Sequence, residues 1–101
     1  MFFITQLVYI KEEGESAFHQ FEEMAIPLIS KYKGRLLLRV RPPGSGIIEN
    51  SIEPPYEIHL IEFESEKDFE HFMQDEERKQ FLYLKEQSIR SVILIKGVLI
   101  K

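Results

Sequence analysis

Two charged residues, Arg39 and Glu62, have the types and positions best suited to chemistry in this sequence. They lie in separate apolar segments, 35–41 and 56–63, that we expect to pair as β-strands. A guanidinium offers a rigid fork of donors for a carboxylate, and a partly desolvated glutamate can act as a general base. One interpretation is a site that binds an anionic molecule and takes a proton from it. The other is a structural ion pair, because buried charges are normally paired.

Five further polar residues are candidates for the same site. His59 can relay a proton as a neutral imidazole, although its position favours a hydrogen-bonded histidine at the core edge. Tyr32 can act as an acid, but a core aromatic residue with its hydroxyl at the rim is the commoner case. Arg41 is expected at the mouth of any cavity there. Thr5 and Gln6 point to opposite faces of one strand, so one of them should enter the cavity.

The composition excludes several chemistries. The sequence has no cysteine, so it can form no disulfide, thiolate nucleophile or thiolate zinc site. His19 shares a helix face with Glu22 and Glu23, and His71 shares one with Asp75. Neither group contains the second histidine of a zinc motif, so we interpret them as solvated helix charges and expect no metal and no cofactor. A net charge of −4 argues against nucleic acid as a partner.

The 101 residues suit one compact domain, which we expect to span 1–101. No apolar run approaches the ~20 residues that a membrane span requires. The apolar start, 1–11, lacks a basic region and a small-residue cleavage site, which favours a first strand over a signal peptide. These features predict a cytoplasmic protein without a membrane partner.

Strands and helices are expected to alternate in the order βαββαβ. Residues rich in β-branched and aromatic types predict strands at 2–10, 35–41, 56–63 and 91–101. Apolar residues at steps of three and four predict a helix over 15–33.

The ends and breaks of the helices also have sequence signals. Pro27 should kink or break the first helix near Met24, and Gly34 should end it as the C′ residue. A capping box that begins at Ser65 should open the second helix, and Asp75 should cap a further helical segment over 76–87.

This order predicts an α+β fold in which both helices cover one face of a four-stranded antiparallel sheet. Phe63 belongs under the second helix, which puts His59 and Ile61 on the same side. The other side of that strand takes Tyr56, Ile58, Leu60 and Glu62. Strict alternation over 35–41 groups Leu36, Leu38 and Val40 on one face. The opposite face takes Arg35, Leu37, Arg39 and Arg41, so Arg39 and Glu62 would share a space. An uncovered apolar sheet face normally marks an association surface, which predicts a homodimer.

The pattern resembles the ferredoxin-like dimeric α/β-barrel superfamily, and within it the family known as domain of unknown function 1330. The stretch PLISKYKGRLLLR, 27–39, is similar to the family's proline, its Tyr-Gly-Gly-Arg and an arginine four residues into the next strand. IEFESEKDFEHF, 61–72, resembles its Glu-Phe-x-Ser followed by a helix with an aromatic residue. Further matching positions are Phe21, Tyr32, Gly34, Arg35, Arg39, Glu62, Phe63, Ser65 and Phe72.

The resemblance implies the barrel fold and a dimer, but it carries no diagnostic catalytic motif. Lys33 stands where the family usually has glycine, Arg78 where a tyrosine is common and Lys85 where an arginine is common. Related antibiotic-biosynthesis monooxygenases use asparagine and tryptophan side chains for an aromatic substrate. This chain has no tryptophan and a single asparagine, Asn50, so we do not expect that chemistry.

We therefore expect a homodimer that binds a small anionic or aromatic molecule in a cavity between the sheet and the partner. The expected lining is Gln6, Arg39, Arg41, Ile58, Leu60 and Glu62. The connection 42–55, with four prolines and two glycines, would act as a lid. As an enzyme the protein would work without a cofactor. The alternative is a structural or regulatory dimer with a filled interface, and a cavity of ~300 Å³ or more beside Arg39 would favour binding.

Overall fold

Four antiparallel strands form a single sheet in this computed structural model, which describes residues 1–100. The strands are β1 (Phe2–Ile10), β2 (Gly34–Val40), β3 (Glu57–Phe63) and β4 (Ile89–Val98). Their order across the sheet is β2-β3-β1-β4, so β1 and β3 occupy its centre. The predicted strands are confirmed, with differences of a few residues at their ends, and residue 101 of the last predicted strand lies outside the described residues.

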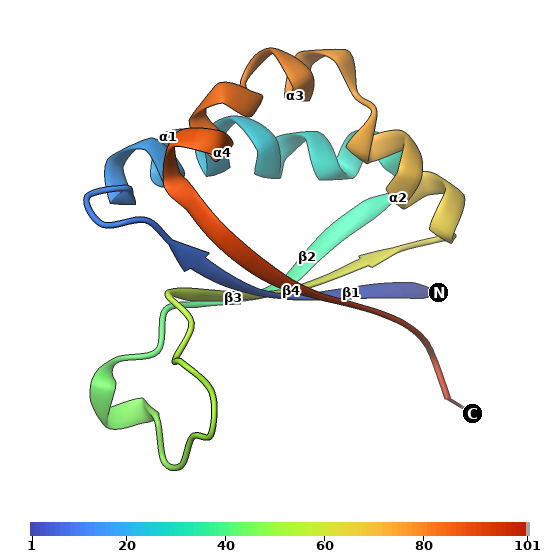
Figure 1. The fold of residues 1–101 in the computed structure, drawn as a ribbon. Coiled ribbons are helices and arrows are strands. Elements are labelled where there is room, and N and C mark those ends of the chain that lie inside the picture. The colour runs from blue at the N-terminus through green and yellow to red at the C-terminus, as the bar shows by residue number, and fades with distance from the viewer. Residues whose placement is uncertain (101) are drawn as a thin grey trace.

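The helices of the two crossovers cover one face of this sheet, as Figure 1 shows, while the short 3-10 helix η2 (Gly44–Gly46) lies in the connection between β2 and β3. The first crossover contains α1 (Glu15–Ala25) and the 3-10 helix η1 (Ile26–Tyr32). The second contains α2 (Glu66–Met73), α3 (Glu76–Gln80) and α4 (Leu82–Ser88). The connection between β2 and β3, residues 41–56, hangs from the opposite side, which we call the open face. No helix within residues 1–100 is long and apolar enough to cross a bilayer.

Pro27 divides the first crossover as the sequence predicts. The chain leaves α1 two residues earlier and continues as η1, because proline cannot donate the hydrogen bond that an α-helix needs. The predicted C′ role of Gly34 is wrong, since Lys33 takes the left-handed conformation with φ 60° and Gly34 already belongs to β2. A Cβ atom at Gly34 would lie 2.6 Å from Ile29 Cγ2 and from the Phe63 ring. Close packing rather than a turn therefore requires this glycine.

Both predicted caps in the second crossover are confirmed. Ser65 Oγ accepts the backbone N–H of Asp68 at 3.2 Å, and Asp75 Oδ1 accepts that of Arg78 at 2.8 Å. The single helix predicted after Asp75 is instead two short helices, because Phe81 leaves the helical conformation with φ −111° and ψ 9°. The helical layer over this part of the sheet is therefore interrupted at Phe81.

A β-bulge in β2 changes which of its side chains face the helices. Leu36 pairs with Ile61 and Leu38 pairs with Leu60, so Leu37 has no partner on β3. One extra residue in a strand reverses the alternation of faces beyond it. The predicted faces of β2 are consequently right before Leu37 and wrong after it.

The corrected faces separate the residues that sequence reasoning had grouped. Arg39 pairs with His59 in the register and lies on the helix side, whereas Arg35 lies opposite Glu62 on the open face. Two apolar residues that follow the bulge reach the open face: Leu38 and Val40.

Along β3 the predicted alternation holds, with its helix-side residues buried and the residues between them half-buried. The helix-side residues are Glu57, His59, Ile61 and Phe63. Tyr56, predicted on the open face, is an exception because it precedes the strand. Its hydroxyl forms a 2.7 Å hydrogen bond with His19 Nε2 on α1.

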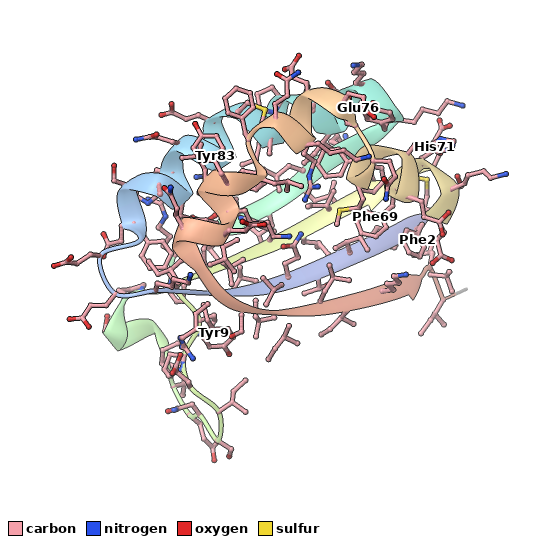
Figure 2. The ribbon with its side chains drawn as sticks, turned by 45° about the horizontal axis from the view of Figure 1, so that its top comes forward. Phe2, Tyr9, Phe69, His71, Glu76 and Tyr83 are labelled. Atoms are coloured by element: carbon pink, nitrogen blue, oxygen red, sulfur yellow. The ribbon has the colours of Figure 1, made fainter. Side chains whose placement is uncertain are left out.

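The core between the helices and the sheet consists of two clusters. The larger is aromatic: Phe2 and Phe69, labelled in Figure 2, have ring centroids 6.0 Å apart, and Phe63 lies 5.6 Å from Phe69. Such a fully buried side chain contributes about 1.5–3 kcal/mol to folding. The smaller cluster joins α1 to α4 through Phe21, Ala25 and Leu84. Because the clusters are separate, the space between them is not filled by a continuous core.

Candidate functional site

A cavity of about 150 Å³ lies between the helices and the sheet. Its walls include members of both core clusters, such as Phe21 and Ala25 on one side and Ile61 and Phe72 on the other. An engineered apolar cavity of about 150 Å³ in another protein accepts benzene. A molecule with a single ring is therefore the size that this cavity can hold.

Five polar side chains interrupt the apolar lining: Gln6, Glu22, His59, Arg78 and Lys85. Gln6 pairs with His59 in the register, so it faces the helices, while Thr5 faces the open side opposite Leu60. Of Thr5 and Gln6, it is therefore Gln6 that enters a cavity. This cavity lies under the helices and not between the sheet and a partner, as the sequence led us to expect. Arg78 and Lys85 come from α3 and α4, which places the two cations on the helical wall.

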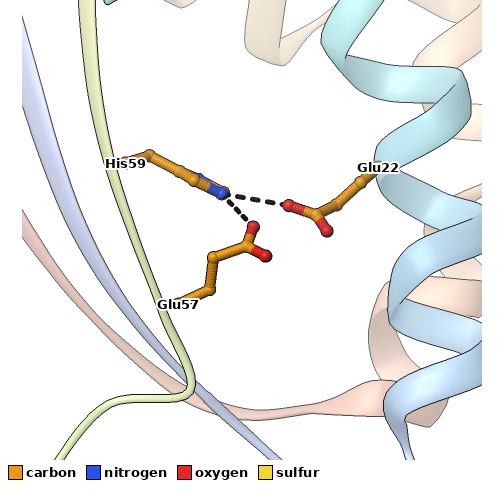
Figure 3. Close-up of side chains that lie close together, drawn as sticks. All are labelled: Glu22, Glu57 and His59. Atoms are coloured by element: carbon orange, nitrogen blue, oxygen red, sulfur yellow. Dashed lines mark hydrogen bonds and ion pairs between the residues drawn. The ribbon is translucent and has the colours of Figure 1, made fainter. Parts of the chain in front are cut away.

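His59 belongs to a buried cluster with Glu22 and Glu57, which Figure 3 shows from the side. His59 Nε2 donates a hydrogen bond to Glu22 at 3.0 Å and a second one to Glu57. Glu22 comes from α1, whereas Glu57 and His59 are neighbours on one face of β3. The cluster therefore ties the first helix to the middle of the sheet.

Two arginines of the β2 edge complete this cluster from outside. Arg39 Nη2 donates to Glu22 Oε1 at 2.7 Å, and Arg39 Nε donates to Glu57 Oε2 at 3.2 Å. Arg41 Nε donates to Glu57 Oε1 at 2.6 Å. A more open hollow of about 300 Å³ lies beside these arginines. It reaches the volume expected of a binding cavity beside Arg39, but its walls are Arg39, Val40, Arg41 and Glu57 alone, so it lacks the apolar lining of a ligand site. Each carboxylate oxygen of Glu22 and Glu57 thus has a cationic donor.

The structure does not bring Arg39 and Glu62 together. Glu62 lies on the open face and pairs with Arg35, whose Nη2 is 2.9 Å from Glu62 Oε1. The bulge at Leu37 is the physical reason, because it turns Arg39 toward the helices. Two other expected lining residues, Ile58 and Leu60, share the open face with Glu62.

The network shifts the pKa values of its central members in opposite directions. Burial alone lowers the pKa of His59, but its hydrogen bonds to Glu22 and Glu57 outweigh burial and raise the pKa above the ordinary 6.5. Burial alone raises the pKa of Glu57, but hydrogen bonds led by that from His59 hold it well below its usual value. His59 therefore favours the imidazolium form, a hydrogen-bond donor, rather than the neutral base that a proton relay requires.

Glu22, Glu57 and His59 resemble a metal site in composition only. Their ligand-type atoms lie within 4.8 Å of one another. A metal ligand must be deprotonated, yet the raised pKa of His59 favours the protonated ring, and the carboxylates are engaged by Arg39 and Arg41. These residues do not fit a metal ion and form a salt-bridge network instead.

Tyr32 lies outside the cavity lining and serves a different contact. Its hydroxyl donates to Asp75 Oδ2, which also pairs with Lys31 Nζ at 3.2 Å. The interpretation of Asp75 as a solvated charge is wrong, because its side chain is 2% exposed. Asp75 fastens the end of the first crossover to the start of α3.

Sequence reasoning missed Glu57, Arg78 and Lys85 and treated Glu22 as a solvated helix charge. Glu22 is buried, and a signal was present, because it adjoins Phe21 on the apolar stripe of α1. Glu57 lies two residues before His59, so strand alternation alone places it on the helix side. Arg78 and Lys85 had no local signal, since a charged residue in a short helix is normally solvated.

The sequence matches no protein-family model and no curated protein. The RPA0582 protein of unknown function from Rhodopseudomonas palustris is 14% identical over 99% of this chain and 82% of its own, with a TM-score of 0.82. A NIPSNAP family protein of unknown function from Agrobacterium tumefaciens is 20% identical over 96% and 86%, with a TM-score of 0.67. A candidate antibiotic biosynthesis monooxygenase from Nitrosomonas europaea is 11% identical over 100% of both chains, with a TM-score of 0.69.

The chain has a ferredoxin-like fold. Four antiparallel strands under two helical crossovers are the arrangement that the sequence predicts, and the TM-scores of 0.67 to 0.82 show that these neighbours share the fold. Identities of 20% or less show the fold and carry no reaction or ligand to this chain. What the ferredoxin-like protein does must therefore be argued from its own cavity.

Proposed function

We propose that this ferredoxin-like protein is a homodimer that binds one small organic molecule in the cavity under the helices of each subunit. The observation that carries the proposal is a cavity of about 150 Å³ with mostly apolar walls and a few convergent polar groups. That combination is typical of ligand sites, although the usual range of about 300–1,000 Å³ is larger. The molecule is therefore compact, with about one ring.

The proposed roles of the predicted residues change with the position of the cavity. His59 and Gln6 contact the ligand, with the His59 imidazolium as a hydrogen-bond donor to an oxygen of it. Arg39 and Arg41 act as positioning residues, because they reach the ligand only through Glu22, Glu57 and His59. Glu62, Ile58 and Leu60 serve the subunit interface instead.

The proposed dimer rests on the open face. This face exposes a group of large apolar side chains, with Leu38 at 49%, Ile95 at 52% and Ile93 at 41%. Such a group normally marks a surface that associates with another protein. A second copy offers the matching apolar surface. The connection 41–56 lies on this side of the sheet, so it can clasp a partner and does not cover the cavity under the helices. Its proposed role changes from a lid to a clasp.

A structural or regulatory dimer without a ligand remains the competing function, and one observation favours it. Every carboxylate oxygen of Glu22 and Glu57 is already bonded, as in a purely structural network. We also propose that the protein is related to the domain of unknown function 1330 family. The motifs at 27–39 and 61–72 support this relationship.

Filling the cavity tests the proposed function. Benzene in solution should shift the amide NMR signals of cavity residues in the wild-type protein. Ala25→Met places a longer side chain in the cavity and should abolish these shifts, whereas Ala17→Met on the same helix but outside the lining should retain them. Absence of wild-type shifts, or equal shifts in the two variants, would favour the structural dimer.

A further inference from the structure

Arg78 has an environment that its own chain does not complete. Its side chain is buried at 6% exposure in the short helix α3. Nη1 donates to the Met73 carbonyl at 3.3 Å, and the guanidinium lies 5.8 Å and 5.2 Å from the ring centres of Phe21 and Phe72. Within residues 1–100, no carboxylate forms a salt bridge with it, and its buried Nε has no hydrogen-bond partner.

This arrangement is unfavourable for a residue with only a structural role. Arginine stays protonated in proteins, and a buried charge normally requires an opposite charge beside it. Burial lowers the pKa of Arg78, which reflects the same desolvation. A methionine would fill the space between Phe21 and Phe72 without that cost. The position of the guanidinium therefore calls for a partner that the protein alone does not supply.

Lys85 adds a second cation to the same cavity. It lies on α4 and lines the cavity with Arg78. Among the residues that the structure describes, Lys85 has no acidic partner, and burial followed by the nearby charge of Arg78 lowers its pKa. Asp75, the acid nearest to Arg78 in sequence, is committed to the Tyr32 hydroxyl, Lys31 and a backbone N–H. The part of the helical wall that α3 and α4 form is therefore positive, whereas the one carboxylate that α1 adds to the lining, Glu22, is already paired with Arg39 and His59.

We propose that Arg78 and Lys85 bind the carboxylate of a small organic acid whose apolar ring or chain fills the cavity. A guanidinium presents paired donors that match a carboxylate, and a lysine ammonium adds a point charge. The other end of such a molecule meets the sheet side of the cavity, where Gln6 and His59 lie. This inference rests on the proposed function and assigns the class of ligand.

Two simpler explanations compete with the proposal. A water molecule can satisfy Arg78 Nε, and the contacts with Phe21 and Phe72 can be a structural cation–π arrangement. Both explanations make Arg78 a contributor to stability rather than to binding. They predict a loss of stability when Arg78 is replaced, and they predict no preference of the cavity for an anion over a neutral molecule of the same shape.

The experiment compares benzoate with benzamide, which have nearly the same shape but differ in charge. Isothermal titration at pH 7 should give benzoate an affinity about tenfold or more above that of benzamide, because charge-assisted hydrogen bonds are the stronger class. Arg78→Met should remove this preference, and Lys85→Met should reduce it. Lys79→Met is the matched control, because Lys79 lies on the same helix but is absent from the cavity lining, and it should leave the preference intact.

Thermal unfolding without ligand supplies the second measurement. Arg78→Met should unfold at the wild-type temperature or above it, and benzoate should no longer raise that temperature. If Arg78→Met fails to fold, Lys85→Met against Lys79→Met decides the question. Benzene binding combined with equal affinities for benzoate and benzamide would overturn this inference alone. Absence of binding by benzene, benzoate and benzamide would overturn the proposed function together with it.

Discussion

His59 is held by two carboxylates, and its charge should depend on each of them. Glu22→Gln removes a carboxylate that hydrogen-bonds to Nε2 at 3.0 Å, so the raised pKa of His59 should fall toward its ordinary value. The ring nitrogen signals of His59 in an NMR pH titration measure this change. Glu23→Gln, which alters the exposed neighbouring residue, is the control and should not move the midpoint. An unmoved midpoint in Glu22→Gln would mean that Glu57 alone sets the charge.

The same raised pKa gives the folded protein a pH dependence of known sign. The folded state binds the His59 proton more tightly than the unfolded chain does, so its contribution is complete below pH 6.5 and is lost as the pH rises through the folded pKa. The free energy of unfolding from urea titrations should decline across that window. In His59→Gln the decline should be absent, and a persistent decline would assign it to other groups.

Arg39 and Arg35 form ion pairs on opposite faces and should differ in their energetic weight. Arg39→Met leaves two buried carboxylates short of a donor and should lower the free energy of unfolding by about 2–4 kcal/mol, because a broken buried pair leaves an uncompensated charge. Arg35→Met removes an ion pair whose arginine side chain is 73% exposed, and it should cost about 1 kcal/mol or less. Urea denaturation of both variants tests this order, and equal losses would contradict the network.

Among the elements, the junction between η1 and α3 depends on Asp75. The Tyr32 hydroxyl, the Arg78 backbone N–H and Lys31 lower the pKa of Asp75 to about 2 from an ordinary 3.8. The contribution of this carboxylate is therefore present above pH 3.8 and lost as the pH falls through about 2. As the pH is lowered from 3.8 to about 2, the urea concentration at the midpoint of unfolding should decrease in the wild type. The decrease should be smaller in Asp75→Asn. Parallel pH profiles would show that other carboxyl groups cause the acid sensitivity.

The elements themselves were predictable because each has a local cause. Pro27 breaks a helix wherever it occurs in one, and Ser65 and Asp75 cap helices through contacts three residues away. The bulge at Leu37 has no such cause. An apolar residue suits either face of this edge strand, so RLLLRVR reads as a regular strand. That single shift exchanged the face of Arg39 and with it the position of the candidate site.

At the scale of the whole molecule, the open face should determine the number of subunits. Ile95→Lys places a charge among exposed apolar side chains and should convert a dimer into a monomer at micromolar concentration. Sedimentation velocity measures the mass. Tyr83→Lys is the control, because Tyr83 is 54% exposed on the helical layer in Figure 2, and it should not change the mass. A monomeric wild-type protein would remove the clasp role of the connection 41–56.

The break between α3 and α4 at Phe81 affects how a ligand can reach the cavity. α3 and α4 contain only five and seven residues, so each is too short to be stable alone and depends on its packing. We expect transient detachment of this pair to uncover the cavity more readily than movement of the longer α1. The ligand should then enter and leave the cavity at the rate at which α3 and α4 detach. Deuterium uptake by the amides of α3 and α4 should therefore slow when a ligand occupies the cavity. The two helices would then control access to the cavity as well as line it.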